Sequence, residues 1–165
     1  MGDTTVVSNP PHDLSGRVAS AVERATTIEA RAVVLGGLLG VVDEALAQLA
    51  EVPATLRLAL GAVERWRVTR DARELEALRG ALSVDLGAIE AEGDGRTIHV
   101  AWAVWNLTRV AENLEESSAL AAARARDCVT HAFEAIAWEP PGAKVSSAER
   151  RATAVHAASV LAARW

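Results

Sequence analysis

Apolar residues recur in alternating steps of three and four along the first third of the chain. The positions that follow this rhythm are Val18, Ala21, Ala25, Ile28, Ala32, Leu35, Leu39, Val42, Leu46 and Leu49. Such spacing is typical of a helix that buries one stripe of side chains against its neighbours. Because the phase does not change at Gly36 and Gly37, the pattern predicts one long first helix over residues 15–51. A break at these two glycines, giving two shorter helices, is the alternative.

The middle of this predicted helix, residues 32–42, contains no charged or hydrogen-bonding side chain. It is too short to span a bilayer, which takes about 20 apolar residues, so we expect it to be buried nearly all round. Glycine inside a helix costs roughly 1 kcal/mol relative to alanine. Close approach of the helix that carries Trp102 and Trp105 would offset this cost, and we expect Gly36 and Gly40 to be the helix-packing positions.

The same apolar rhythm continues downstream and predicts further helices over residues 53–68, 71–92, 96–138 and 146–165. The acidic and serine residues at positions 115–118 interrupt the third of these stretches. Acidic residues favour a helix N-terminus over a C-terminus, so residues 96–138 form either one kinked helix or two helices. The sequence therefore predicts an all-α, single-domain bundle of five or six helices over residues 14–165, behind a flexible tail at residues 1–13.

Composition agrees with this fold class, because half of the residues are apolar, a quarter are charged, and there is no Tyr and a single Phe. The net charge of −5 argues against a protein that tracks nucleic-acid phosphates. Cys128 is the single cysteine, so no intrachain disulfide can form. No stretch has the length of a membrane span or the pattern of a secretory signal. We expect a cytoplasmic protein without membrane insertion and without a cofactor.

Candidate chemistry lies on one face of the helix predicted before Trp138. Arg124, Asp127, His131 and Glu134 follow one another in steps of three, four and three residues, which places them along one polar stripe. Histidine can act as an acid or base near neutral pH, and a carboxylate one turn away can orient it and raise its pKa. A metal site would need His99 or His156 from another helix as a third ligand, so we expect none.

The segment from Arg124 to His131 also resembles the HEPN domain family. In that family an Arg and a His, separated by four to six residues on a helix of a small all-α bundle, cleave RNA, commonly across a dimer. The resemblance implies that Arg124 and His131, with Asp127 between them, form such a site. It covers one helix, and Arg151 to His156 has a similar spacing. Ribonuclease activity is therefore kept as an alternative hypothesis.

Trp102 and Trp105 widen the apolar face of the helix predicted from residue 96. We expect them to pack against a neighbouring helix, and a pocket for a small apolar ligand lined by them is the alternative. No glycine-rich phosphate loop and no cluster of Cys and His occurs in the sequence. We therefore expect a non-enzymatic protein that associates with a protein partner or with itself, in an accessory, antitoxin-like or immunity-type role. Ribonuclease activity and apolar-ligand binding are the alternatives.

Overall fold

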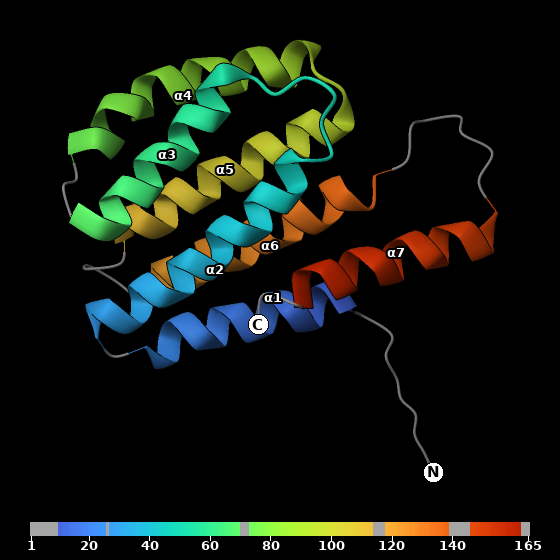
Figure 1. Ribbon diagram of the computed structural model, residues 1–165, viewed down its shortest axis with the longest axis horizontal. Helices are drawn as coiled ribbons and strands as arrows, with labels where there is room; N and C mark the ends of the chain where they lie inside the picture. Colours follow the sequence, from blue (N-terminus) through green and yellow to red (C-terminus); the bar gives the residue numbers. More distant parts are fainter. Residues whose placement is uncertain (1–9, 26, 70–72, 114–117, 139–145, 163–165) are drawn as a thin grey trace.

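The computed structural model describes residues 10–25, 27–69, 73–113, 118–138 and 146–162, and only the backbone of residues 10–15, 28, 74, 77, 118 and 157–162. Within these residues the chain forms seven helices and no strand (Figure 1). The helices are α1 (Pro10–Arg24), α2 (Ile28–Leu46), α3 (Ala54–Thr69), α4 (Arg73–Glu92), α5 (Gly95–Asn113), α6 (Ser118–Ile136) and α7 (Ser147–Ala162). The all-α class is confirmed, and the predicted count of five or six helices is wrong.

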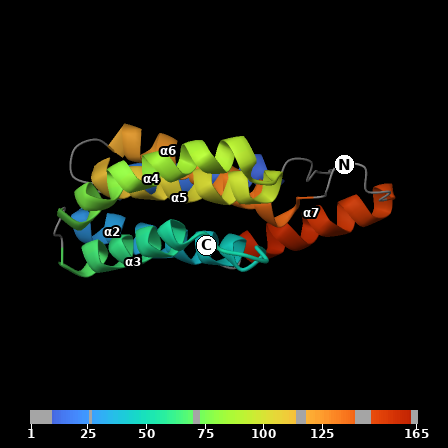
Figure 2. The same ribbon diagram turned by 90° about the horizontal axis from the view of Figure 1, so that it is seen from above.

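Helices α5 and α6 form the centre of the bundle and run in opposite directions (Figure 1). Helix α1 packs against α6, α3 pairs with α4, and α2 contacts both α5 and α6. Seen from above, α4, α5 and α6 lie in one layer and α2 and α3 in a second, with α7 at one end (Figure 2). None of the helices in the described segments combines the length and apolar character that crossing a membrane requires.

The core follows the predicted stripes in most of the helices. In α3 the fully buried residues include Leu56 and Val63, and in α4 the stripe is buried at Leu75, Leu82 and Leu86. The buried residues of α5 are Val100, Ala101, Ala103, Val104, Asn106, Leu107, Thr108, Val110 and Ala111. A helix with so many buried positions is surrounded by other helices, which agrees with its central place.

The predicted long helix over residues 15–51 is wrong, because the chain turns back between α1 and α2. Thr27 adopts an extended backbone with φ −115° and ψ 156°, and its side chain accepts a hydrogen bond from the Ala30 N–H at 3.1 Å. This is the geometry of an N-cap, which satisfies a donor that the first turn leaves free. Arg31 Nε donates to the Ala25 carbonyl at 3.0 Å, which satisfies an acceptor after the end of α1. The alternative break at Gly36-Gly37 is also wrong, since both glycines lie inside α2.

The middle of α2 is fully buried along one face and partly buried over most of the others. Leu35, Leu38, Val41 and Val42 are fully buried, while 73% of Val33 is exposed. The neighbour of Gly36 is a side chain of α3, because a Cβ atom at this glycine would lie 3.6 Å from Nη1 of Arg67. The space in front of Gly36 is therefore occupied by Arg67 and not by the helix of Trp102 and Trp105.

Two helix boundaries also differ from the sequence-based expectation. Helix α1 begins at Pro10, inside the predicted tail, where a proline suits the first turn because it needs no N–H donor there. Residues 1–9 of that tail lie outside the described residues. Residues 96–138 contain two helices, α5 and α6, so the single kinked helix is excluded and the two-helix alternative holds.

Candidate functional site

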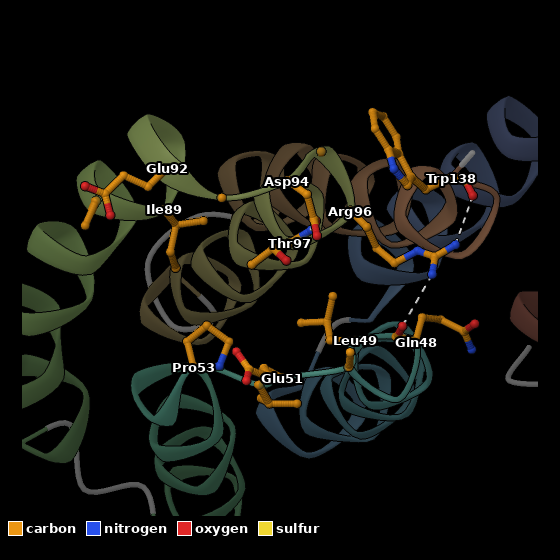
Figure 3. Close-up of a pocket in the computed structure, with 15 residues that line it drawn as sticks. Gln48, Leu49, Glu51, Pro53, Ile89, Glu92, Asp94, Arg96, Thr97 and Trp138 are labelled. Atoms are coloured by element: carbon orange, nitrogen blue, oxygen red, sulfur yellow. Dashed lines mark hydrogen bonds between the residues drawn. The ribbon is translucent and has the colours of Figure 1, made fainter. Parts of the chain in front are cut away.

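A cleft of about 1140 Å³ opens at the end of the bundle where α2, α4 and α6 finish and α3 and α5 begin (Figure 3). Its apolar lining includes Leu49, Val52, Pro53, Ile89 and the indole of Trp138. Its ionisable lining residues are Glu51, Glu92, Asp94 and Arg96. A concave, mainly apolar surface with a few polar groups is the usual character of a small-molecule site.

Arg96, in the first turn of α5, joins the walls of this cleft. Its Nε donates to the Ala135 carbonyl at 3.0 Å. Its Nη2 donates to the Trp138 carbonyl at 2.9 Å and its Nη1 to the Gln48 carbonyl at 3.4 Å (Figure 3). Carbonyl groups at helix ends have no partner within their own helix. One guanidinium therefore satisfies acceptors at the ends of both α2 and α6 and holds the two segments beside the start of α5.

Trp138 follows the end of α6 and lies directly against Gly95, the first residue of α5. A Cβ atom built on Gly95 would overlap the six-membered ring of the Trp138 indole. Glycine is required here because the indole approaches the backbone closely. The Trp138 ring system is also near His99, with ring centroids 6.0 Å apart and planes inclined by 54°.

Asp94 caps the N-terminus of α5 at the edge of the cleft. Its Oδ1 accepts a hydrogen bond from the Thr97 backbone N–H at 2.8 Å. The backbone and side chain of Thr97 lower the pKa of the Asp94 carboxyl, and the nearby charge of Arg96 adds to this effect. Asp94 is therefore ionised near neutral pH, and the lining of the cleft carries three carboxylates against one guanidinium.

The second polar feature is a pair of histidines between α5 and α6. The Nδ1 atoms of His99 and His131 are 3.1 Å apart, and the Trp102 indole stacks on His131 with centroids 6.3 Å apart and planes inclined by 26°. Burial lowers the pKa of His131, the neighbouring His99 lowers it further, and Asp127 and Glu134 act in the opposite direction with smaller effect. The carboxylate of Asp127 therefore raises this pKa as expected, but burial and His99 outweigh it, so the net pKa is lowered.

The predicted stripe of α6 is half-buried at Arg124 and His131 and exposed at Asp127 and Glu134. Among the described residues, no hydrogen bond or ion pair joins Arg124 to His131. The buried Oδ1 of Asn106 has no hydrogen-bond partner within the described part of the chain. His131 thus belongs to the contact between α5 and α6, and none of the four predicted residues lines the cleft.

Other chemistry considered from the sequence is accounted for by packing. Cys128 is fully buried, and burial raises the pKa of its thiol strongly, so it does not present a thiolate. In the segments that the structure describes, no group of three His, Cys, Asp or Glu residues could hold a metal ion. Trp102 and Trp105 are half-buried, and neither lines the cleft. The tryptophan of the cleft is Trp138, which no feature of its local sequence singles out.

No protein-family model, curated protein or solved structure matches this chain.

Proposed function

We propose that this protein is a non-enzymatic binding protein that holds a small organic ligand in the cleft at the end of the bundle. The observation that carries the proposal is the cleft itself, which has about 1140 Å³ of space and a lining that combines the Trp138 indole, aliphatic side chains and a few charged groups. Ligand sites in proteins are commonly clefts of several hundred to about 1,000 Å³ with this kind of lining. The proposal keeps the ligand-binding alternative and moves the site away from Trp102 and Trp105.

The hydrogen bonds of Arg96 favour a cleft whose walls are already in place before a ligand binds. They connect the segment after α2, the start of α5 and the end of α6 across separations of 39, 42 and 48 residues. Walls that are already fixed lose little conformational entropy on binding, so more of the contact energy becomes affinity.

Binding can be tested by NMR with a panel of chemically varied small molecules. The indole N–H signal of Trp138 is assigned from its loss in Trp138→Phe. We expect at least one compound to shift this signal saturably while the signals of Trp102 and Trp105 stay in place. A panel without any response, or a response confined to Trp102 and Trp105, would contradict the proposal.

Two arginine substitutions on α4 form a matched pair for the same experiment. Ile89 lines the cleft, whereas Val84 is on the same helix and 72% exposed. Ile89→Arg should abolish binding because it fills the cleft, and Val84→Arg should leave binding unchanged. Equal loss in both variants would mean that the ligand does not bind in the cleft.

Association with a second protein molecule is the second candidate, and it has a separate observation in its favour. Val33 on α2 and Val68 on α3 are each 73% exposed. The contact of Gly36 with Arg67 brings the start of α2 beside the end of α3, so both valines lie toward the same end of the bundle. Light scattering on the double variant Val33→Glu, Val68→Glu should show dissociation, with Val84→Glu as the control. A parent protein that is monomeric at high concentration would contradict this candidate.

The ribonuclease alternative rests on Arg124 and His131. Its support is the lowered pKa of His131, which keeps the imidazole neutral and able to accept a proton near pH 7. RNA cleavage by the parent protein should disappear in His131→Ala and persist in His156→Ala, whose residue is exposed on α7. A parent protein without cleavage activity, or an active His131→Ala protein, would end this alternative.

A further inference from the structure

We infer that the ligand of the cleft is a small organic cation with an apolar group attached to its charged head. This inference rests on the proposed function and adds the chemical class of the ligand. It follows from the distribution of charge in the cleft, from the position of one indole, and from the aliphatic walls beside them.

The charge of the cleft favours a cation over an anion. Glu51, Glu92 and Asp94 supply three carboxylates, and Arg96 is the single basic residue among the described residues of the lining. The donors of Arg96 are directed at the carbonyl groups of Ala135, Trp138 and Gln48, so its guanidinium is occupied within the protein. An anionic ligand would therefore meet uncompensated carboxylates, while a cation would be attracted by them.

One of these carboxylates is held in its charged form by the fold. The Thr97 backbone donates to Asp94 at 2.8 Å, and this bond lowers the pKa of the carboxyl. Helix ends act in the same direction, because α2, α4 and α6 finish at the cleft and the C-terminal end of a helix carries partial negative charge. The N-terminal ends of α3 and α5 offset this in part, and that of α5 is already capped by Asp94.

The indole of Trp138 adds a recognition element for a positively charged group. Its position is fixed by contact with Gly95, and its backbone carbonyl is bonded to Arg96. The face of an indole attracts a cation, and the attraction is stronger when the cation has lost its water shell. Quaternary and other alkylated ammonium groups fit such a surface because they are large and weakly hydrated.

The remaining walls distinguish an organic cation from a metal ion. Leu49, Pro53 and Ile89 offer apolar surface, which stabilises an attached hydrocarbon group in proportion to the area that the group covers. A metal ion would need several ligands converging on one point. The described residues contain no group of three acidic, His or Cys residues that could provide them.

Three probes with the same aromatic ring test the sign of the ligand's charge. They are benzyltrimethylammonium, benzyl alcohol and phenylacetate, and the readout is the shift of the Trp138 indole N–H signal. We expect benzyltrimethylammonium to bind at least about tenfold more tightly than benzyl alcohol. Phenylacetate should bind more weakly than either, and added salt should weaken binding of the cation alone.

Charge-neutral variants test whether the carboxylates of the cleft cause the preference for the cation. Glu51→Gln combined with Glu92→Gln should remove most of the preference for the cation over benzyl alcohol, because two of the three attracting carboxylates are lost and the charge of the remaining Asp94 is balanced by that of Arg96. Glu23→Gln, on the exposed surface of α1, should leave the preference unchanged. A preference that survives the first change, or falls equally in the second, would overturn the inference.

The outcomes also separate this inference from the proposed function. Tighter or equal binding of benzyl alcohol or phenylacetate would overturn the assignment of a cation and leave the cleft as a ligand site. Failure of all three probes to bind would overturn the inference. The wider compound panel would then decide whether the cleft binds any ligand.

Discussion

The Nδ1 atoms of His99 on α5 and His131 on α6 lie 3.1 Å apart at the contact between the two central helices. At this distance one nitrogen donates a proton and the other accepts it, so the contact requires at least one neutral ring. Protonation of both rings would place two N–H groups, each on a positively charged ring, against each other. The contact is therefore compatible with neutral pH and is lost in acid.

Stability should fall as the pH drops below about 6.5, the ordinary pKa of histidine. Because the pKa of His131 is lowered in the folded protein, the unfolded chain binds more protons in this range, and stability rises with pH. No further stability is lost once the pH is below the pKa that His131 has in the folded protein. Urea unfolding between about pH 5 and about pH 8 measures it. His131→Gln should flatten the profile and His156→Gln should not; a flat profile in the parent would contradict the prediction.

Replacement of Gly36 by alanine should stabilise the protein by about 1 kcal/mol. The new Cβ would lie 3.6 Å from Arg67 Nη1, an ordinary contact, and alanine is the better helix former. Gly36→Leu should be less stable than Gly36→Ala, because the larger side chain displaces Arg67 and its bond of 2.7 Å to Glu64. Gly80→Ala, with open space at its Cβ, is the control for propensity alone. Chemical denaturation measures the change in the free energy of unfolding for each of the three variants. A Gly36→Ala protein that is less stable than the parent would contradict the prediction.

Replacement of Gly95 by alanine should destabilise the protein, in contrast to the replacement of Gly36. A methyl group there would overlap the Trp138 ring, and overpacking of this kind typically costs about 1–3 kcal/mol. Thermal unfolding would show the loss, and a displaced Trp138 indole signal would show its origin. Gly87→Ala, on α4 with nothing within 4 Å of its Cβ, should not be destabilised. An unchanged melting temperature in Gly95→Ala would mean that the indole is not held against α5.

Arg96→Lys should destabilise the protein by about 1–3 kcal/mol. A lysine ammonium cannot reproduce the planar fork that reaches the carbonyls of Ala135, Trp138 and Gln48. Arg57→Lys, on an exposed position of α3, should change stability by less than about 0.5 kcal/mol and is the matched control. Equal stability of the two variants in urea would show that the three bonds contribute nothing net.

The helical stripes were predictable because apolar spacing reports directly on which face of a helix is buried. Leu75, Leu82 and Leu86 show this on α4. The turn before α2 was not predictable from this spacing. Helices α1 and α2 each bury a stripe with the same spacing, and the two stripes happen to keep a common phase across Thr27. Periodicity alone cannot tell one helix from two such helices in sequence. The side chain of Thr27, an ordinary N-cap residue, was the available signal.

The candidate sites depend on how the helices pack against one another, which the sequence of a single helix does not show. The polar character of α6 at His131 was visible in the sequence, but its partner His99 was fixed only by the register of α5 against α6. The cleft is assembled from the ends of five helices, and Arg96 and Trp138 become neighbours through the packing of α5 on α6. Neither residue lies in a motif, so sequence reasoning missed both.

The bonds of Arg96 also have a consequence for local opening. Since they join the segment after α2 to the end of α6 through the start of α5, none of these three segments can separate without exposing carbonyl groups of another. The backbone amides near Leu49 and near Ala137 should therefore have the same free energy of opening when it is measured by hydrogen exchange. One side chain makes this end of the bundle a single cooperative unit, which a ligand would protect from solvent as a whole.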